Sequence, residues 1–123
     1  MKKTIVVIER DSDILNVVEY ILTERGYNVI SFEEEDEAFE KIVEIQPDGI
    51  LLDIIKPSDA GIKLCLALRE AEKTKNIPVI ALSTHPKAVA VKGICAEEVL
   101  SKPFDIDELV AAVDEQFVFD LSL

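Results

Sequence analysis

Six residues that could do chemistry stand directly after apolar runs of strand length in this 123-residue sequence. They are Glu9, Arg10, Asp11, Asp53, Ser83 and Lys102. If the runs are neighbouring parallel strands, the residues that follow them meet at the carboxyl edge of one sheet, where ligands of such sheets collect. Acids, a hydroxyl and a lysine gathered at that edge could accept and hold a phosphoryl group.

Each residue type suits one part of phosphoryl transfer. A carboxylate such as Asp53 can attack phosphorus and form a mixed anhydride. Neighbouring acids can hold Mg²⁺, which offsets the negative charge on the phosphoryl oxygens. Lys102 can supply a positive charge, and Ser83 a hydrogen bond, to the same oxygens. Within its own segment, Asp53 could equally be a polar strand end or a helix cap.

The elements that must position these residues alternate along the chain. The hydrophobic pattern predicts five strands separated by helices. Alternation of this kind predicts a parallel sheet with helices on both faces, an α/β doubly wound architecture. The strands are expected at residues 4–8, 27–32, 50–53, 78–82 and 97–101.

The first and last helices carry the clearest boundary signals. The first is expected from Asp13, and Gly26 stands where a left-handed residue ends a helix. The last is expected to open with a capping box, in which Asp105 is the cap and Glu108 stands three residues later.

Of the three middle helices, the first is expected to carry Ala38, Phe39, Ile42 and Val43 on its apolar face, and the second to end at about Lys73. The third, around 87–93, is expected to be short and poor in strong helix formers. Five consecutive acids, residues 33–37, are expected to open the first of these helices. Acids at a helix N-terminus are favoured by its dipole, so the run is interpreted as a solvated surface rather than a binding site.

The composition is that of one globular domain, expected to span residues 1–123. Apolar residues make up 49% and charged residues 31%, and no apolar run approaches the ~20 residues of a membrane span. Thirteen basic and 25 acidic residues give a net charge of −12, which repels nucleic acid and anionic lipid. We therefore expect a cytoplasmic protein with no direct nucleic-acid partner and no membrane partner.

The two cysteines, Cys65 and Cys95, are 30 residues apart in apolar segments. They lack the CxxC spacing of redox and zinc motifs. Separate buried thiols in a reducing compartment are therefore expected.

The chain resembles the receiver domain of bacterial two-component response regulators over essentially its whole length. Three motifs in order carry the resemblance: Ile-Leu-Leu-Asp at 50–53 with Pro57 and Gly61 behind it, Ile-Pro-Val-Ile-Ala-Leu-Ser at 77–83, and Leu-Ser-Lys-Pro-Phe at 100–104. The resemblance implies a five-stranded (βα)5 domain of flavodoxin-like topology with strand order 2-1-3-4-5.

The resemblance also implies roles for individual residues. Asp53 would be the phosphoacceptor, Ser83 the switch hydroxyl, and Lys102 the lysine that contacts the phosphoryl group. The bond between Lys102 and Pro103 would be cis. The function implied is phosphorelay with a histidine kinase or phosphotransfer protein, and catalysis would extend no further than self-phosphorylation and autodephosphorylation.

A Mg²⁺ ion would be held by Glu9, Asp53 and the backbone carbonyl of Ile55, but Arg10 departs from the family at this point. Receivers usually have a second acid there, which ligates the metal directly. A guanidinium ~4 Å from a divalent ion would cost several kcal/mol even at an effective dielectric constant of ~20. The resemblance and this departure together predict a weakened Mg²⁺ site.

Two interpretations of Arg10 remain open. In the favoured one, its guanidinium takes the place of the metal and forms a bidentate ion pair with Asp53. In the other, Arg10 points away as a surface residue, and Asp53 accepts phosphate slowly with Glu9, Asp11 and Mg²⁺.

Three further features bear on signalling. Val99 stands at the position of the family's switch aromatic, so coupling through ring rotation is not expected. His85 is interpreted as a surface loop histidine rather than a phosphoryl relay. The apolar tail 117–123 either packs back on the domain or marks a dimer or partner surface.

Two functional hypotheses follow. The first is a phosphorelay receiver, favoured by Asp53, Ser83 and Lys102. The second, favoured by Arg10 and Val99, is a pseudo-receiver that acts without phosphorylation as an interaction or dimerisation module. A phosphatase-like metalloenzyme is disfavoured because it needs another catalytic acid. Beside the kinase, the partners to consider are a second copy of the chain and an output protein.

Overall fold

The chain folds around a five-stranded parallel sheet with strand order β2-β1-β3-β4-β5. The fold comes from a computed structural model that describes residues 2–55 and 60–118. The strands are β1 (Thr4–Ile8), β2 (Asn28–Phe32), β3 (Gly49–Asp53), β4 (Val79–Ser83) and β5 (Glu98–Ser101). Each predicted strand is present within one residue of its expected start and end, and the predicted fold class and strand order are confirmed.

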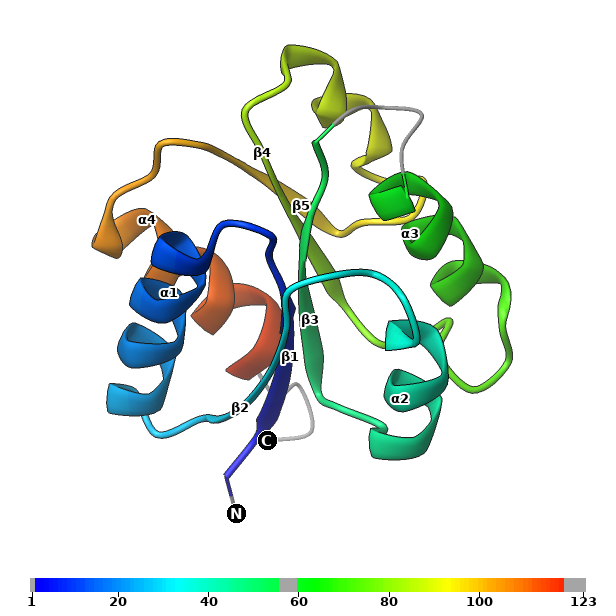
Figure 1. The fold of residues 1–123 in the computed structure, drawn as a ribbon, viewed down its shortest axis with the longest axis horizontal. Helices are drawn as coiled ribbons and strands as arrows, with labels where there is room; N and C mark the ends of the chain where they lie inside the picture. The colour runs from blue at the N-terminus through cyan, green and yellow to red at the C-terminus, as the bar shows by residue number, and fades with distance from the viewer. Residues whose placement is uncertain (1, 56–59, 119–123) are drawn as a thin grey trace.

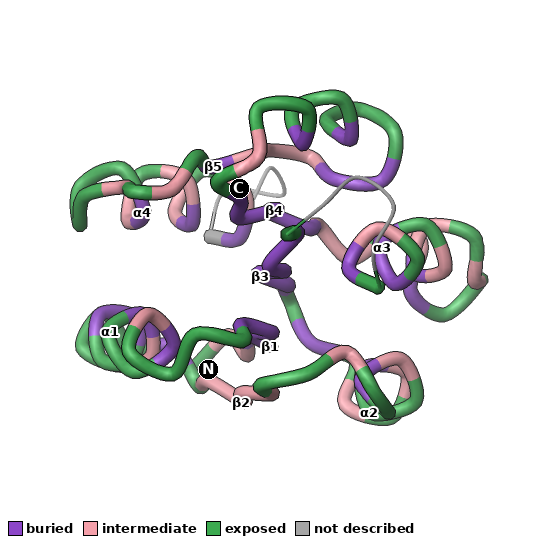
Figure 2. Tube along the Cα trace, turned by 45° about the horizontal axis from the view of Figure 1, so that its top comes forward, coloured by how far each residue is buried: buried purple, intermediate pink, exposed green. Residues whose placement is uncertain are grey.

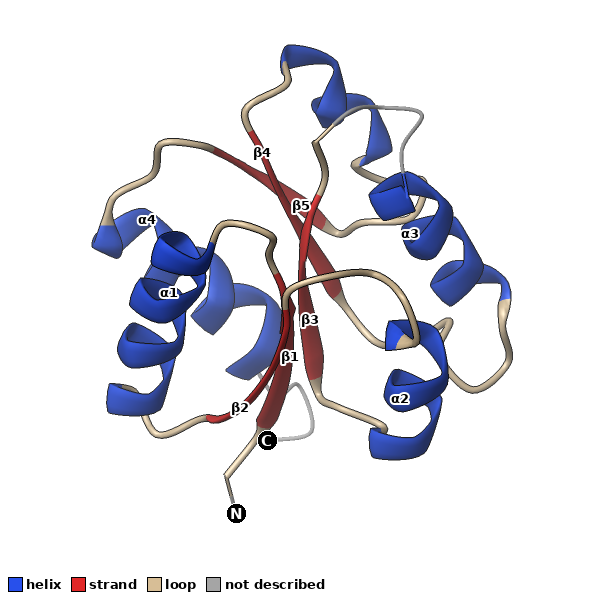
Figure 3. Cartoon of the chain, in the orientation of Figure 1, coloured by secondary structure: helices blue, strands red, loops and turns tan. Residues whose placement is uncertain are grey.

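Helices cover both faces of the sheet (Figures 1 and 3). They are α1 (Ser12–Glu24), α2 (Ala38–Ile45), α3 (Ala60–Glu70) and α4 (Ile106–Val113), with a 3₁₀ helix η1 (Pro86–Val91) and a π-helical turn η2 (Asp114–Val118). The helices α1 and α4 pack on one face, whereas α2 and α3 pack on the other. The doubly wound arrangement leaves the carboxyl edge of the strands open for a site.

The strands β3 and β4 form the centre of the core, because every residue in them is buried (Figure 2). Successive side chains of a strand point to opposite faces. In β3, Ile50 and Leu52 pack against the α2 and α3 side, and Leu51 packs against the α1 and α4 side. The continuous apolar run at 50–52 therefore reflects a strand covered on both faces.

The predicted helix boundaries of α1 and α4 are confirmed within one residue at their starts. Asp11 caps α1 by accepting hydrogen bonds from the amides of Asp13 and Ile14. Gly26 has a φ of 93°, the left-handed value expected after α1. Both hydrogen bonds of the predicted capping box of α4 are present.

The prediction that the acidic run 33–37 opens α2 is wrong. The helix begins at Ala38, and Glu37 before it has a φ of 66°, which a right-handed helix does not permit. The five acids therefore lie in the loop that joins β2 to α2. In that loop they come close to the carboxyl edge of β1.

Two middle helices also differ from prediction. The helix expected at 87–93 is the 3₁₀ helix η1, which begins at Pro86 and is capped by His85. The helix stops at Lys92, whose ψ of 126° is extended, although Lys87, Ala88 and Ala90 are themselves strong helix formers. The helix α3 ends at Glu70, three residues earlier than expected, and the chain continues in turns.

The prediction of separate cysteine thiols is wrong, because Cys65 and Cys95 form a disulfide. Both residues are buried. The fold packs α3 against the segment that leads into β5, and this brings the two Cα atoms to 5.6 Å, a distance that a disulfide spans. Spacing along the sequence carried no sign of this proximity.

The end of the described chain packs back on the domain. The ring of Phe117 is 3% exposed and lies against Gly49 at the start of β3. The remainder of the tail, 119–123, lies outside the described residues. Within the described part of the chain, no helix has the length and apolar character needed to cross a membrane.

Candidate phosphoacceptor site

The side chains of Glu9, Asp53 and Lys102 meet at the carboxyl edge of the sheet. The Lys102 Nζ lies 2.6 Å from Glu9 Oε1 and 3.0 Å from Asp53 Oδ1. All three side chains are at least nine-tenths buried, with exposed fractions of 10%, 1% and 6% for the lysine, the glutamate and the aspartate. Two carboxylates therefore share one ammonium group in a space largely closed to water.

The order of the strands produces this convergence. Glu9 follows β1, and Asp53 ends β3, which pairs directly with β1. The Ile54 amide donates to the carbonyl of Leu82 in β4, and the Lys102 amide donates to the carbonyl of Ser83, each at 2.8 Å. These bonds fix the backbone on either side of Asp53 and at the base of the lysine. The peptide bond between Lys102 and Pro103 is cis, as predicted.

Burial dominates the electrostatics of Glu9. It raises the pKa of the Glu9 carboxyl, and the nearby charge of Asp53 raises it further. The hydrogen bonds from Lys102 and from the Asp11 amide oppose this shift but do not cancel it. Glu9 must share the ammonium with Asp53, so its negative charge is only partly compensated.

Lys102 shows the opposite balance. Burial alone would lower its pKa, but the hydrogen bonds to Glu9 and Asp53, together with their charges, raise it. An ammonium between two carboxylates gains from both, whereas each acid gains from one. Lys102 is therefore a firmly charged cation at the centre of the cluster.

Ser83 ends β4 beside this cluster and is 3% exposed. Its Oγ accepts a hydrogen bond of 3.0 Å from the amide of His85. The acceptance leaves the hydroxyl proton available for donation. The His85 Nδ1 itself accepts from the amide of Lys87, so the histidine side chain caps η1.

The favoured interpretation of Arg10, an ion pair with Asp53, is wrong. The Arg10 Nη2 lies 2.5 Å from Glu35 Oε1, and the ion pair that Asp53 makes among the described residues is with Lys102. The Arg10 side chain is 44% exposed and is directed toward the loop after β2. This agrees with the second interpretation, except that the arginine is held by an acid rather than loose on the surface.

Both the side chain and the backbone amide of Asp11 make structural hydrogen bonds. Its carboxylate caps α1, and its amide donates to Glu9 Oε2 at 3.1 Å. This hydrogen bond holds the Glu9 carboxylate in place through the oxygen that does not face Lys102. Asp11 therefore supports the cluster through its backbone.

The family model of the response regulator receiver domain matches residues 5–114 of the chain. This match covers most of the sequence, including β2 to β5 and all of β1 except Thr4. The chain belongs to this family. It is accordingly a receiver domain of two-component signal transduction, and the phosphorylation-independent alternative is not favoured.

Solved structures show the same fold. A response regulator from Chloroflexus aurantiacus is 26% identical, with a TM-score of 0.87 over 97% of this chain and 100% of its own. The chemotaxis protein CheY4 of Vibrio cholerae is 24% identical, with a TM-score of 0.84 over 94% of this chain and 99% of its own.

The receiver domain of a sensor histidine kinase from Pseudomonas aeruginosa is 23% identical, with a TM-score of 0.82 over 97% of this chain and 100% of its own. Its structure has a magnesium ion coordinated in the active site cleft. The comparisons place the chain among signalling domains that generally bind Mg²⁺ and act with histidine kinases, phosphotransfer proteins and output domains.

The side chains of the present receiver fit a divalent cation. Glu9 and Asp53 are buried and share the one ammonium of Lys102, so the pair of carboxylates keeps an excess of negative charge. Mg²⁺ in proteins is usually bound through one or two carboxylates together with water and phosphate oxygens. Glu9 and Asp53 provide two, and Arg10 is turned away from them. The side-chain part of the site is therefore limited to two acids, since the described part of the chain holds no cluster of three acid, histidine or cysteine side chains suitable for a metal.

Sequence reasoning missed the part that Glu35 plays. The acid stood in a run that was assigned to a solvated helix start, yet its side chain is 7% exposed and paired with Arg10. The left-handed residue Glu37, which moves the run into the β2 to α2 loop, has no clear sequence signal. A lone arginine in place of a family acid was the one indication that a counter-charge was needed.

Proposed function

We propose that Asp53 is the phosphoacceptor of this receiver domain and that Lys102 and Ser83 bind the phosphoryl group once it is attached. The observation that carries the proposal is the shared ion pair, in which one buried ammonium contacts both Asp53 and Glu9. A buried lysine beside a strand-end aspartate can compensate the charge that arrives with a phosphoryl group.

An Asp53 carboxylate oxygen attacks phosphorus, the bond from phosphorus to the donor histidine nitrogen breaks, and the imidazole leaves as its neutral form after taking up a proton as required. Lys102 moves its hydrogen bond from the carboxylate to a phosphoryl oxygen. Ser83 donates its hydroxyl proton to another. In autodephosphorylation, a water oxygen attacks phosphorus, the bond from phosphorus to the Asp53 carboxylate oxygen breaks, inorganic phosphate leaves, and the carboxylate is regenerated.

A divalent cation fits the same site. Glu9 and Asp53 would hold Mg²⁺ through their carboxylates, and the backbone carbonyl of Ile55 would complete the protein ligands. When bound, the ion supplies positive charge that offsets the charge on the phosphoryl oxygens. Glu9 supports this role because its buried carboxylate shares a single ammonium with Asp53, which leaves an excess of negative charge at the two acids.

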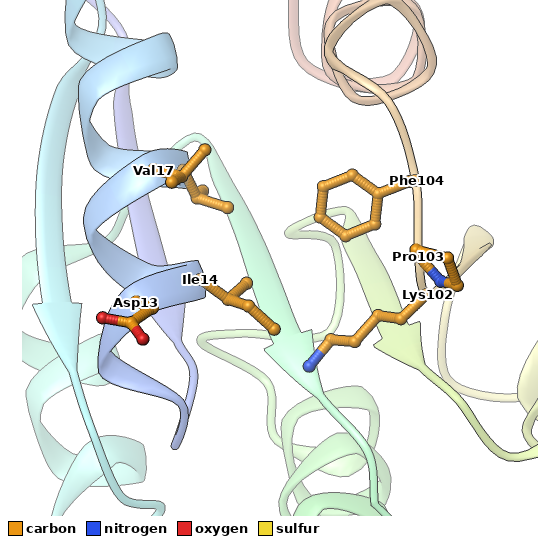
Figure 4. A pocket seen from close by; sticks show the side chains of 7 residues that line it. Asp13, Ile14, Val17, Lys102, Pro103 and Phe104 are labelled. Carbon is orange, nitrogen blue, oxygen red and sulfur yellow. The ribbon is translucent and has the colours of Figure 1, made fainter.

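The phosphoryl donor is proposed to be a histidine kinase or a phosphotransfer protein. An apolar cavity of about 270 Å³ opens beside Lys102, between α1 and the segment that leads into α4 (Figure 4). Ile14 and Val17 line it from α1, and Phe104 faces them across it. A donor helix seated there would bring its histidine to the edge of the sheet where Asp53 lies.

The test is incubation with a small acyl phosphate in the presence and absence of Mg²⁺, followed by intact mass measurement. The wild type and an Asp107→Ala control, which removes an exposed acid of α4, are expected to gain the mass of one phosphoryl group. Asp53→Ala should gain none. Equal labelling of Asp53→Ala would contradict the assignment of the phosphoacceptor.

We further propose that residues 1–123 form one receiver domain and that it works in the cytoplasm, where kinases of this system deliver phosphoryl groups. Its catalysis would be limited to self-phosphorylation and autodephosphorylation. Association with a second copy or an output protein would carry the signal onward. The Cys65 to Cys95 disulfide would then have to persist in a reducing compartment, and its complete burial favours that.

A further inference from the structure

We infer that Glu35 is a positioning residue of the phosphoacceptor site, because it holds the Arg10 guanidinium on the β2 side and away from the carboxylates of Glu9 and Asp53. The effect is to leave the cation-binding space at those carboxylates to Lys102 and a divalent ion. This inference rests on the proposed function, since it concerns the cation of the same site.

The backbone brings the two residues together. Arg10 and Glu35 belong to the loops after β1 and β2, which are adjacent parallel strands. The Glu9 amide donates to the carbonyl of Phe32 at 3.0 Å, so the two loops leave the sheet side by side. The ion pair of 2.5 Å between Arg10 Nη2 and Glu35 Oε1 then joins them.

The two side chains of the pair are buried to different extents: the Glu35 carboxylate is held inside the loop, and the more exposed Arg10 guanidinium comes to it. The Glu35 side chain is 7% exposed, whereas that of Arg10 is 44% exposed. The second carboxylate oxygen, Oε2, is buried and has no hydrogen-bond partner among the described residues. A buried carboxylate with an unsatisfied oxygen depends strongly on its cation, so the departure of Arg10 would be costly.

The competing position for Arg10 is the carboxylate cluster. Arg10 adjoins Glu9 in sequence, and Glu9 and Asp53 share only one ammonium between two negative charges. That excess of negative charge attracts a second cation. Without the Glu35 carboxylate, the Arg10 guanidinium loses the ion pair that directs it toward the β2 side, and its presence at Glu9 and Asp53 would repel Mg²⁺.

The acidic run offers a matched control. Glu34 is the neighbour of Glu35 and carries the same charge, but it is exposed. Glu34→Gln and Glu35→Gln therefore remove the same charge from the same loop. Only the second removes the acid that pairs with Arg10.

The first experiment locates Arg10 without any metal or phosphate. In a crystal structure of Mg²⁺-free Glu35→Gln, the Arg10 guanidinium is expected within hydrogen-bond distance of Asp53 or Glu9. In Glu34→Gln it should remain on Glu35. An Arg10 that stays on the β2 to α2 loop in Glu35→Gln would overturn the inference.

The second experiment measures Mg²⁺ binding by calorimetry in a double-mutant cycle. Glu35→Gln is expected to weaken binding about tenfold, and Glu34→Gln by about twofold or less. In an Arg10→Gln background, Glu35→Gln should have no more effect than Glu34→Gln, because there is no guanidinium to release. Equal effects of Glu35→Gln in both backgrounds would contradict the inference. Circular dichroism of each variant establishes that it is folded.

The two proposals can fail separately. Absence of labelling at Asp53 in the wild type would overturn the proposed function, while the position of Arg10 in Mg²⁺-free Glu35→Gln would still decide the role of Glu35. Conversely, normal labelling with an unmoved Arg10 would retain the phosphoacceptor and reject the positioning role.

Discussion

The ammonium of Lys102 lies closer to Glu9 than to Asp53, at 2.6 Å against 3.0 Å. The lysine is thus shared, and its nearer partner is the acid after β1 rather than the proposed phosphoacceptor. With both carboxylates buried, this one cation compensates two charges. The same geometry supports the proposed transfer to Asp53, because the lysine can turn to the new anion while remaining near Glu9.

Lys102→Met should expose how much the two acids depend on the lysine. Breaking a buried ion pair by removing one partner leaves uncompensated charge, so the free energy of unfolding is expected to fall by about 2 to 4 kcal/mol. Saturating Mg²⁺ should recover part of the loss, because the ion binds the same carboxylates. Urea denaturation at neutral pH, with and without Mg²⁺, measures both effects.

Lys87→Met is the control for that experiment. Lys87 is exposed and lies in η1, so its removal should change the free energy of unfolding by about 0.5 kcal/mol or less. A similar loss for both variants would mean that the effect comes from net charge and not from the cluster.

Glu9 predicts a pH dependence of stability. Because burial raises the pKa of its carboxyl, Glu9 binds a proton more readily in the folded than in the unfolded chain. Its contribution to the free energy of unfolding therefore declines as pH rises above the ordinary value of 4.5 and through the raised folded value. Lys102 adds no slope in this window, because its own raised pKa keeps it charged there.

Glu9→Gln cannot ionise and should lose that decline. We expect the Mg²⁺-free variant to be at least as stable as the wild type at neutral pH, whereas its Mg²⁺ binding should be strongly reduced. Urea denaturation at several values from about pH 5 to about pH 8 gives the slope. A decline in Glu9→Gln as steep as that of the wild type would contradict this account.

The disulfide should contribute measurably to stability. Closing the chain between Cys65 and Cys95 restricts the unfolded state, and loops of this size correspond to about 2 to 4 kcal/mol. Cys65→Ser is expected to lower the free energy of unfolding by that amount. A thiol reductant, which reaches the buried bond once the chain unfolds, should then lower the free energy of unfolding of the wild type but leave that of the variant unchanged. If the reductant affected both equally, the effect would not come from this bond.

The sequence predicted the parts of the fold that depend on local pattern. The apolar runs of β1 and β3 are buried on both faces, so their strands are evident from composition alone. The capping box at Asp105 is likewise a local signal, and it predicted the start of α4. Convergence of Asp53 and Lys102 follows from parallel strands ending at one edge.

Features that depend on packing between distant segments were not predictable. The partner of Arg10 is decided by where the loop after β2 runs, and that path depends on a left-handed residue, Glu37, with no clear signal in its sequence. The cysteine pair depends in the same way on how α3 meets the segment before β5. The sequence shows that Arg10 needs a counter-charge and that two cysteines are present, but only the fold shows that Arg10 pairs with Glu35 and Cys65 with Cys95.

Gly49 and Phe117 provide a test of the packing that closes the domain beneath the site. A Cβ atom on Gly49 would lie 2.5 Å from Cδ1 of the Phe117 ring, closer than two carbon atoms can approach. The ring is buried and cannot turn into solvent without losing its contacts. Gly49→Ala is therefore expected to lower the free energy of unfolding by about 1 to 3 kcal/mol, as overpacking of a core does. Combining it with Phe117→Leu should restore part of this loss, since the smaller side chain leaves room for the methyl group.

Gly93→Ala is the control for an alanine that is harmful without any contact with a ring. A Cβ atom at Gly93 would meet no atom within 4 Å, but the φ of 83° is unfavourable for alanine. Phe117→Leu should rescue Gly49→Ala and leave Gly93→Ala unrescued, and thermal denaturation of the four variants measures the difference. Equal rescue of both would show that the contact between ring and glycine is not the cause.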